Sequence, residues 1–572
     1  MLPLTRQWKV ADILPPEIDR LLEIYPPILR QILFNRKYMD LDAVRMFLEA
    51  RAPEGTDPLN MLGVEAAAER IEFALRHGER IAIYGDYDVD GVTATALLTQ
   101  TLGALGADVT GYIPNRFDEG YGLNNEALDT LRSNGIQLVV TVDCGVRSLE
   151  EAQHANELGL DLIISDHHHP KSVLPEAVAL INPKQPGDTY PEEDLAGVGL
   201  AYKLVTGLFR VLGRRGYSIP DRLEEDLLDL VALGTVADLA PLSGENRALV
   251  RAGLQAMRRP RRQGLLSLIG VCGLRADQLT ATHIGFVLGP RLNAAGRLDS
   301  ALAAYELLTT ENVFEAGRLA QLLDGQNRER QKITREIQEH AEQLALANQP
   351  DGLLLFAAHP DYNPGVVGLA ASRLVDSYYR PAIVAQRGEE FTRGSCRSIP
   401  EFHITEALDQ CAGLLERHGG HAAAAGFTVR NENLAMLAEQ LQQIAAEQLG
   451  HLDLRPILHA DAEIPLTDLK PDLLNYLDWL QPTGFGNRQA VFVTRGLKVS
   501  SCRTVGREAA HLKLSVTDGW ITYDAIAFRQ GHWKEQMPER VDLMYTFERN
   551  EFNGRVSLQL NVKDLRPAGT LD

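Results

Sequence analysis

Short continuous apolar runs in the first half of the chain alternate with stretches of helical pattern. From about residue 79 the runs lie at residues 81–84, 109–113, 138–142 and 162–164. Continuous apolar strands separated by helices are typical of a parallel sheet that is buried on both faces. Helices are expected between and after these strands, at residues 91–102, 195–212 and 223–236. The pattern therefore predicts an α/β domain over residues 51–310.

A proline-free stretch rich in Glu, Gln, Arg, Ala and Leu follows at residues 311–348 and predicts a long helix. This helix either connects two bodies, with an interruption possible at Gly325, or is an ordinary bundle helix. A second β/α pattern predicts a smaller α/β body over residues 349–450. Its expected strands and helices lie at residues 353–356, 366–379, 382–385, 404–417 and 433–448. Residues 1–50, with several prolines and short helical patterns, are expected to form an N-terminal helical lead-in.

The last part of the chain, residues 451–572, has a different pattern, in which apolar and polar residues alternate over short segments. These segments lie at residues 491–493, 512–516, 522–528 and 556–560. Alternation is typical of strands with one buried face, and Asn553-Gly554 is a hairpin-turn signal. A small antiparallel barrel fits this pattern, and an oligonucleotide-binding (OB) barrel is the leading interpretation.

Composition narrows the class of protein. The 572 residues are 45% hydrophobic and 23% charged, which is ordinary for a globular protein of several domains. The chain contains no apolar run of the ~18–20 residues that a membrane span needs, so we expect a soluble, cytoplasmic protein without a membrane partner. The five cysteines are scattered and form no Cys-x-x-Cys pair, which argues against a disulfide framework or a cysteine zinc site. The net charge of −20 argues against a protein that coats nucleic acid, although an enzyme with a local basic channel remains compatible with it.

The strongest chemical signal is the sequence DYDVDG at residues 86–91, where the first strand ends and a helix is expected to begin. Ligand sites in open α/β sheets gather at the carboxyl ends of strands. Asp86, Asp88 and Asp90 repel one another there, and a bound hard cation is the usual compensation. The alternative is a turn whose acidic side chains only cap the helix.

Further acidic and imidazole side chains occupy equivalent places. Asp143 follows the third strand, the sequence Asp166-His167-His168 follows the fourth, and Asp238 ends the helical run at residues 230–237. Each alone fits a helix cap or a surface turn, but parallel strands bring their ends to one rim of the sheet. Oxygen ligands with one or two imidazoles suit Mg²⁺ or Mn²⁺, and there are enough for two ions ~3.5–4 Å apart. The residues by themselves therefore predict a two-metal phosphoesterase.

The order of these motifs resembles the DHH phosphoesterase superfamily, which is named for the Asp-His-His sequence seen at residues 166–168. The other matching motifs are DYDVDG at 86–91, VTVDCG at 140–145, LAGVG at 195–199, GTVAD at 234–238, GPRLNAAGR at 289–297 and GGHAAAAG at 419–426. With a barrel at the end, the chain is most similar to the bacterial single-strand-specific DNA exonucleases of this superfamily. The resemblance implies a DHH catalytic domain at 51–310, a DHHA1-type substrate-binding domain at 349–450 and an OB-like nucleic-acid-binding domain at 451–572.

The resemblance also implies an activity and a set of roles. The activity is 5′→3′ hydrolysis of single-stranded DNA to 5′-mononucleotides with Mg²⁺ or Mn²⁺, in DNA repair and recombination. The implied metal ligands are Asp86, Asp88, Asp90, Asp143, His167 and Asp238. We take Asp143 as the carboxylate that bridges the two ions. His168 is expected to contact the scissile phosphate, and Asp166 to orient a histidine from behind.

Basic and polar residues would then handle the DNA. Ser395 and Arg397 resemble the family's pocket for a 5′-phosphate, for which an Arg fork beside a hydroxyl is suited. The other expected contacts are Arg116 near the metal rim, Arg291 in a catalytic role or on the DNA backbone, Arg297 on the backbone, and Gly420 with His421 beside a phosphate or base. A surface ion pair is the alternative for Arg116, and a tight turn for the last two. Cys396 stands where family members carry a small residue, and could make the pocket sensitive to oxidation.

Two other functions compete with the exonuclease. One is a DHH hydrolase of short oligoribonucleotides, cyclic dinucleotides or pyrophosphate, but such proteins are usually shorter and lack a terminal barrel. The other is a binding subunit that has lost catalysis, which the complete acidic set argues against. The resemblance suggests a single-strand-binding protein and a helicase as partners. A monomer is compatible with a chain that carries its own channel between the two α/β bodies.

Overall fold

The computed structural model describes residues 5–116, 118–120, 122–552 and 555–570. It divides into two compact units, which are described separately. The larger unit contains residues 9–323 and 459–572, and the smaller unit contains residues 324–458 with the N-terminal segment up to Trp8. Among the described residues, no helix is both long enough and apolar enough to cross a membrane.

The larger unit is built on a five-stranded parallel sheet with the order β3-β2-β4-β5-β6. The strands are β2 (Ile81–Gly85), β3 (Val109–Tyr112), β4 (Leu138–Val142), β5 (Asp161–Ser165) and β6 (Ala179–Ile181). Alternate strand residues point to opposite faces, and each face carries its own hydrophobic core. The predicted parallel sheet with two buried faces is confirmed.

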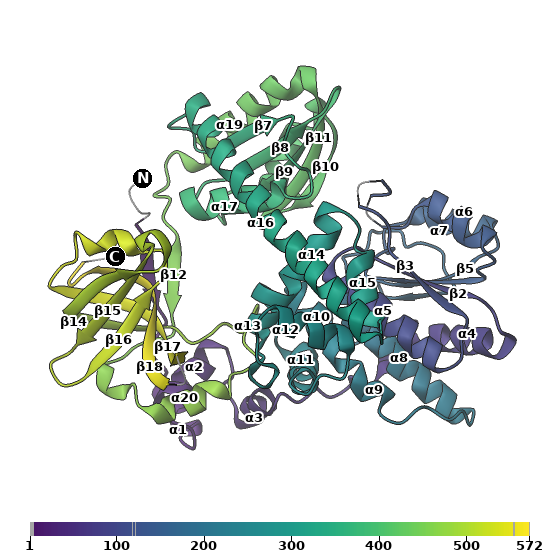
Figure 1. The fold of residues 1–572 in the computed structure, drawn as a ribbon, viewed down its shortest axis with the longest axis horizontal. Helices are drawn as coiled ribbons and strands as arrows, with labels where there is room; N and C mark the ends of the chain where they lie inside the picture. The colour runs from purple at the N-terminus through teal and green to yellow at the C-terminus, as the bar shows by residue number, and fades with distance from the viewer. Residues whose placement is uncertain (1–4, 117, 121, 553–554, 571–572) are drawn as a thin grey trace. The chain divides into compact units, whose positions relative to one another are not determined.

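Helices cover both faces of this sheet, as Figure 1 shows. One face packs against α4 (Val64–His77), α5 (Val89–Ala104), α8 (Gly197–Arg214) and α10 (Leu228–Ala237). The other face packs against α6 (Asn125–Ser133) and α7 (Leu149–Glu157). The helix predicted at residues 223–236 is in fact two helices, because the chain turns at Leu227 between α9 (Leu223–Asp226) and α10.

A helical layer completes this part of the larger unit and leads into a long helix. Its members are α11 (Gly244–Met257), α12 (Gln263–Val271), α13 (Ala281–His283), the π-helical turn Ile284–Leu288, α14 (Gly289–Leu298) and α15 (Leu302–Thr309). Helix α16 (Val313–Asn348) then runs for 36 residues. Gly325 does not interrupt it, because one glycine costs only ~1 kcal/mol in a helix of this length.

The smaller unit has a mixed five-stranded sheet with the order β10-β11-β9-β8-β7. Only β7 (Leu355–His359) and β8 (Ala382–Arg387) are parallel; β9 (Phe391–Arg397), β11 (Ala424–Arg430) and β10 (Leu415–His421) are added antiparallel. Its helices are α17 (Val367–Tyr378), α18 (Ile404–Gln410) and α19 (Leu434–Leu449). The helix predicted at residues 404–417 is wrong beyond Gln410, because residues from Leu415 pair with β11 instead. Strand pairing overrides a weak helical pattern there.

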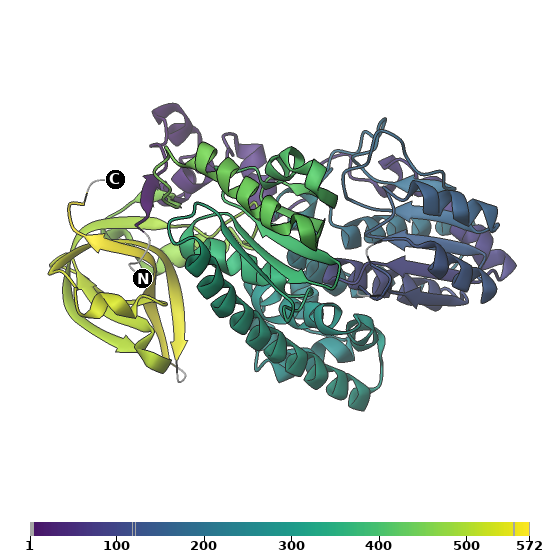
Figure 2. The same cartoon turned by 90° about the horizontal axis from the view of Figure 1, so that it is seen from above.

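The C-terminal part of the larger unit is a closed five-stranded barrel, seen in Figure 2 as a ring of lime and yellow strands. Its strands are β14 (Phe492–Val505), β15 (His511–Thr517), β16 (Thr522–Ala527), β18 (Arg555–Pro567) and β17 (Arg540–Phe552), and β17 pairs with β14 to close it. The OB-like barrel is confirmed, with one difference: β16 and β18 are parallel, so the barrel is not wholly antiparallel. The hairpin signal Asn553-Gly554 lies outside the described residues.

The N-terminal helices share one hydrophobic core with the barrel. They are α1 (Pro16–Leu21), α2 (Pro27–Asn35) and α3 (Leu41–Glu49), with α20 (Pro471–Asp478) on the barrel side. The lead-in is not wholly helical, because β1 (Gln7–Val10) pairs with β12 (Ile457–Ala460).

A buried arginine ties the barrel segment to the helical layer. Arg247 on α11 is 1% exposed and donates hydrogen bonds to the backbone carbonyls of Phe47, Trp479, Leu480, Gln481 and Pro482. Its guanidinium also lies 4.1 Å from the centre of the Phe47 ring. These donors satisfy the carbonyls of an irregular buried segment, which would otherwise be costly to bury.

Candidate metal centre

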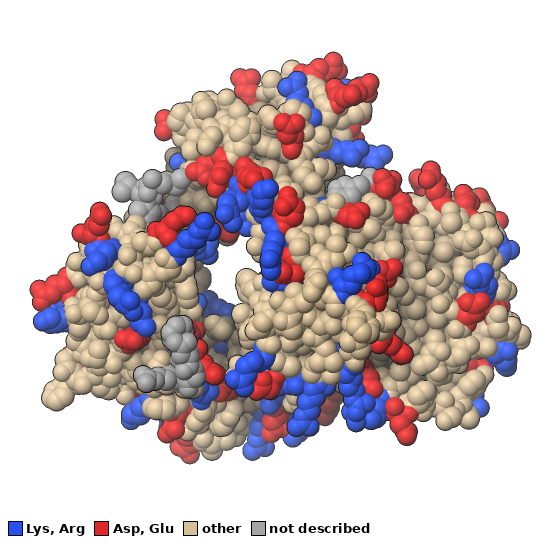
Figure 3. Space-filling model, in the orientation of Figure 1, with Lys and Arg blue, Asp and Glu red and all other residues tan. Residues whose placement is uncertain are grey.

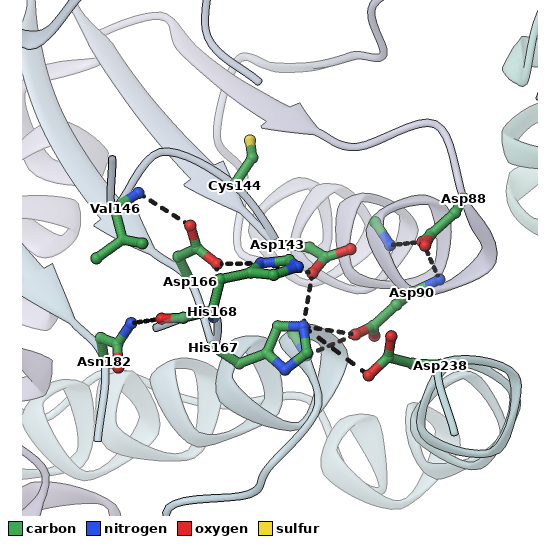
Figure 4. A network of polar contacts seen from close by, with 12 residues as sticks. Asp88, Asp90, Asp143, Cys144, Val146, Asp166, His167, His168, Asn182 and Asp238 are labelled. Carbon is green, nitrogen blue, oxygen red and sulfur yellow. Dashed lines mark hydrogen bonds and ion pairs between the residues drawn. The ribbon is translucent and has the colours of Figure 1, made fainter. Parts of the chain in front are cut away.

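The predicted acidic residues meet at one rim of the parallel sheet. Asp86 follows β2, Asp143 follows β4, Asp166 and His167 follow β5, and Asp238 follows the last residue of α10. Figure 4 shows most of these side chains converging on one small volume. Three groups of side chains have their ligand atoms within 4.8 Å of one another: Asp86/Asp88/Asp143, Asp143/His167/His168 and Asp90/His167/Asp238. The structure therefore brings together all six predicted metal ligands.

Two of the acidic residues also cap helices. Asp88 is the N-cap of α5, and its Oδ1 accepts hydrogen bonds from the amides of Asp90 and Gly91 at 2.8 and 3.1 Å. Asp90 is buried, and its two oxygens accept from the amides of Gly197 and Val198 at 2.6 and 2.7 Å, at the start of α8. The expected capping of the helix is thus found for Asp88 alone, whereas Asp90 binds the first amides of α8, and both residues remain in the cluster. The caps hold the two carboxylates in place.

The glycines of the sequence motifs allow this close packing. A Cβ on Gly197 would lie 2.7 Å from the Cβ of Asp143, and one on Gly234 would lie 2.9 Å from Oδ1 of Asp90. Either distance is shorter than any normal contact, so a larger residue would displace a carboxylate. The LAGVG and GTVAD motifs therefore bring helices α8 and α10 against the acidic rim.

Burial and mutual repulsion make the ionised carboxylates unfavourable as they stand. Burial, with Asp88 next in importance, raises the pKa of Asp86 to about 8 and that of Asp90 to about 7. Burial followed by Asp90 raises the pKa of Asp238 to about 9, and the same causes hold the pKa of Asp143 well above its usual value. A nearby positive charge is needed for all of them to be ionised at neutral pH.

His167 has the properties of a metal ligand. Burial, and then the charge of His168, lower its pKa to about 3, so the imidazole is neutral and its lone pair is available. Its Nε2 lies 3.1 Å from Asp143 Oδ1, 3.9 Å from Asp238 Oδ2 and 4.0 Å from Asp90 Oδ2.

Two buried atoms provide a test of whether a cation fits. Within the described residues, Oδ1 of Asp86 has no hydrogen-bond partner, and Nε2 of His167 forms no hydrogen bond although it lies 3.1 Å from Asp143 Oδ1. Buried polar atoms without partners are rare, and several oxygen acceptors around one imidazole nitrogen are the donor set of a divalent cation. The residues therefore fit Mg²⁺ or Mn²⁺.

Asp166 and His168 form a pair beside the cluster. Oδ1 of Asp166 lies 2.7 Å from Nδ1 of His168 and accepts from the His168 amide at 3.0 Å, while its Oδ2 accepts from the amide of Val146 at 2.9 Å. Burial would lower the pKa of His168, but the bond to Asp166 outweighs it and the pKa is raised. His168 keeps 41% of its side chain exposed, so a substrate can reach it.

Two of the three predicted basic residues of the larger unit, Arg116 and Arg297, lie near Tyr87. The Arg116 guanidinium lies 5.1 Å from the centre of the Tyr87 ring, and the charges of Arg116 and Arg297 both act on the Tyr87 hydroxyl. Arg291 donates a hydrogen bond to the carbonyl of Val287, one turn earlier. Further along the chain, Arg262 forms a buried ion pair with Asp229 at 3.0 Å.

The predicted phosphate pocket lies in the smaller unit. Nη1 of Arg397 donates to Ser395 Oγ at 3.2 Å, and both side chains lie against the first turn of α17, where a Cβ on Gly368 would come within 2.8 Å of Ser395 Oγ. Gly420, with φ of 155°, pairs with Ala425 on β11, where a Cβ would collide with the backbone. His421 is exposed at the end of β10.

Cys396 does not line this pocket. It lies between Ser395 and Arg397 on β9, so its side chain points to the other face of the sheet, where it is 0% exposed. Burial raises the pKa of its thiol to about 12. The expectation of an oxidation-sensitive pocket is therefore wrong.

Two residues near the metal cluster escaped the sequence analysis. Asn182 and Lys184 follow β6, the last strand of the parallel sheet to end at this rim, and they donate to the carbonyls of His168 and His167. Their position just after a strand, the topological place that Asp86, Asp143 and Asp166 also occupy, is the signal that could have identified them. Strand β6 is only three residues long, so its apolar run is too short to recognise.

Comparisons with known protein families agree with this arrangement. The DHH family, N-terminal domain, matches residues 80–235; the DHHA1 domain matches residues 351–447; and the RecJ OB domain matches residues 460–564. The fold and the acidic rim thus define a DHH-family protein with a DHHA1 domain.

Comparisons with whole proteins narrow the class. The single-stranded-DNA-specific exonuclease RecJ of Escherichia coli (strain K12) is 35% identical over 578 residues, which cover 96% of this chain and 98% of the relative. The RecJ of Bacillus subtilis (strain 168) is 38% identical over 542 residues, covering 94% of this chain and 68% of the relative. The crystal structure of RecJ in complex with Mn²⁺ from Thermus thermophilus matches with a TM-score of 0.84 at 29% identity, over 99% of this chain and 80% of that one. The chain belongs to the RecJ family of single-stranded-DNA-specific exonucleases.

Proposed function

We propose that this chain is a metal-dependent exonuclease that degrades single-stranded DNA in the 5′→3′ direction to 5′-mononucleotides, in DNA repair and recombination. The observation that carries the proposal is the cluster of carboxylates and a neutral imidazole at the sheet rim, with buried ligand atoms that need a cation. The names of the relatives support the substrate, and solved RecJ structures with Mn²⁺ and with Mg²⁺ support the cofactor.

The metal site follows from the three groups of ligand atoms. Asp143 belongs to two of the groups, which is what a carboxylate shared between two ions requires. The proposed ligands are Asp86, Asp88, Asp90, Asp143, His167 and Asp238. When bound, two divalent cations supply a hydroxide nucleophile and neutralise the charge that develops on the phosphate.

The side chains around this site have separate roles in the proposal. His168, held by Asp166 and partly exposed, donates a hydrogen bond to a non-bridging oxygen of the scissile phosphate. Arg116 and Arg297 bind the DNA backbone beside Tyr87, and Arg291 assists at the scissile phosphate. Each of these side chains is proposed to contact phosphate groups and not bases, so the site is expected to accept any DNA sequence.

A pocket for the 5′-phosphate accounts for the polarity of the reaction. Ser395 and Arg397 offer a hydroxyl and a guanidinium fork, and both side chains lie against the first turn of α17. Gly420 and His421 on β10 are proposed to contact the DNA from the edge of the same sheet. A terminal phosphate dianion carries more charge than a phosphodiester, so such a pocket selects the strand end.

The first experiment uses single-stranded DNA with a 5′-phosphate and a label at its 3′ end. Progressive shortening with Mn²⁺, and none with EDTA, is the expected result. Loss of the reaction in Asp88→Ala would connect it to the rim. Tight binding without shortening would instead favour a binding subunit. If the chain neither binds nor cleaves this DNA, a hydrolase of short oligoribonucleotides, cyclic dinucleotides or pyrophosphate would be favoured.

The partners follow from the proposed reaction. A helicase would supply single strands, a single-strand-binding protein would cover them, and both would meet the chain in the cytoplasm, where bacterial DNA lies. We propose that the chain itself acts as a monomer. Co-purification with each partner tests the two interactions. Light scattering of the pure protein tests the oligomeric state, and a stable dimer would contradict the proposed monomer.

A further inference from the structure

The segment that carries the two imidazoles has little regular structure of its own. Residues 166–169 follow β5 and belong to no helix or strand. Their backbone therefore lacks the repeated hydrogen bonds that hold a strand or helix in position. The orientation of His167 and His168 must depend on other contacts.

Side chains from neighbouring segments hold three successive carbonyls of this loop. Nζ of Lys184 donates to the carbonyl of His167, Nδ2 of Asn182 donates to that of His168, and Nε of Arg147 donates to that of His169, each at 2.8 Å. The bond from Asn182 to His168 is drawn in Figure 4. The loop thus receives from side chains the fixation that a strand receives from its neighbours.

The three donor side chains differ in how deeply they are buried. Asn182 is 0% exposed, and its Oδ1 accepts from the amide of Lys184 at 2.8 Å, so the two donors form one unit. The Lys184 side chain is 13% exposed, and its Nζ also lies 3.8 Å from the Asp194 carboxylate. Arg147 is exposed, and it holds His169, which is not among the proposed ligands.

We propose that Asn182 and Lys184 are positioning residues that fix the two imidazoles, His167 above all, in the orientation that metal binding requires. The inference rests on the proposed function, because it assumes that His167 binds a metal ion. Loss of either donor leaves a part-buried carbonyl without its side-chain partner and lets the peptide rotate. Contacts of this kind behind a ligand typically change metal affinity by about 10- to 100-fold.

The charge of Lys184 acts in the opposite direction to its hydrogen bond. The ammonium group lies close enough to Asp238 to influence that carboxyl electrostatically. Removing a nearby positive charge strengthens the binding of a cation, whereas loosening His167 weakens it. Weaker cation binding in Lys184→Met would therefore indicate that Lys184 positions His167, whereas tighter binding would indicate that Lys184 acts only through its charge.

The test measures Mn²⁺ binding to the full chain without DNA, by electron paramagnetic resonance of the free and bound ion. Asn182→Ala is expected to weaken binding by about 10- to 100-fold and Lys184→Met by about 10-fold, with loss of the nitrogen coupling from a bound imidazole. Lys184→Arg keeps a donor and is expected to retain wild-type binding within about threefold. Arg147→Ala is the matched control, since it removes a donor to the same loop and a charge, and should bind like wild type.

The outcomes are distinct. Wild-type affinity and nitrogen coupling in both Asn182→Ala and Lys184→Met, or tighter binding in Lys184→Met, would overturn the inference while leaving the proposed function intact. No Mn²⁺ binding by the wild-type chain would instead overturn the proposed function and the inference with it. Circular dichroism checks folding, and if Asn182→Ala does not fold, the partly exposed Lys184 decides the question through Lys184→Met and Lys184→Arg.

Discussion

The candidate metal centre of the larger unit and the proposed phosphate pocket of the smaller unit are assembled in different ways. The metal centre collects side chains from the ends of β2, β4 and β5 and from α10, so segments far apart in the chain must meet. The pocket takes Ser395 and Arg397 from one strand, two residues apart and therefore on one face, and sets them against the start of α17. One site depends on the packing of the whole domain, and the other depends mainly on the alternation within a single strand.

The two sites carry opposite charges, and their expected ligands also differ in the sign of their charge. The metal centre concentrates carboxylates whose pKa values are raised by burial and by one another, and it needs a cation. The proposed pocket places a guanidinium beside a hydroxyl, and we expect it to bind a dianion. The net charge of −20 describes neither site, and Figure 3 shows acidic and basic groups intermingled over the surface in view.

Removal of the shared carboxylate should break the metal centre alone. We expect Asp143→Ala to lower the cleavage rate by about 10³-fold or more, since the two ions contribute several kcal/mol to the transition state. Binding of single-stranded DNA should remain measurable in a fluorescence anisotropy assay. Asp108→Ala is the control, because this aspartate is 63% exposed and precedes β3 at the opposite end of the sheet. Full activity in Asp143→Ala would contradict the metal assignment.

Removal of the guanidinium should break the pocket alone. We expect Arg397→Ala to reduce the preference for 5′-phosphorylated over 5′-hydroxyl DNA by about 10- to 100-fold, the equivalent of roughly 1.5–3 kcal/mol for a charge-assisted hydrogen bond. Mn²⁺ binding should not change. Arg393→Ala removes an exposed arginine from the same strand and serves as the control. If the preference is unchanged in Arg397→Ala, this residue does not belong to the pocket.

A single methyl group can perturb the metal centre without removing a ligand. Gly197→Ala places a Cβ 2.7 Å from that of Asp143, so the carboxylate must move. We expect Mn²⁺ affinity to fall by about 10-fold, measured by isothermal titration. Gly213→Ala lies on the same helix in open space and should leave the affinity unchanged. Equal affinities for both variants would show that the rim is more adaptable than its packing implies.

The corresponding methyl group in the pocket should have the smallest effect. Gly368→Ala brings a Cβ within 2.8 Å of Ser395 Oγ and 3.0 Å of Arg397 Nη2. The tip of an arginine side chain can yield, so we expect the 5′-phosphate preference to drop only about threefold, roughly 0.6 kcal/mol. Competition between phosphorylated and unphosphorylated strands measures this change, with Gly325→Ala, in open space on α16, as the control. A loss as large as that in Arg397→Ala would mean that the pocket is rigid.

Local pattern predicted most of the elements and failed where pairing partners were distant. The apolar strands β2, β4 and β5 and the long α16 were predicted within a few residues, because burial on both faces and a proline-free helical composition are readable in one segment. Strands β9 and β10 were not predicted, since Gly394, Gly419 and Gly420 and their polar neighbours show no apolar alternation. Their strand state comes from pairing with β11.

By itself the sequence determined which residue types stand at the end of each strand, and so the chemistry of the metal centre. The positions of Asp86, Asp143 and His167 were predictable because a parallel sheet brings its carboxyl ends to one rim. Only the tertiary structure decided that Asp88 and Asp90 also accept from helix N-terminal amides, that Cys396 faces the core, and that Asn182 and Lys184 donate to the carbonyls of His168 and His167. Such roles depend on atoms brought within hydrogen-bonding distance from distant segments, which a pattern along one chain does not contain.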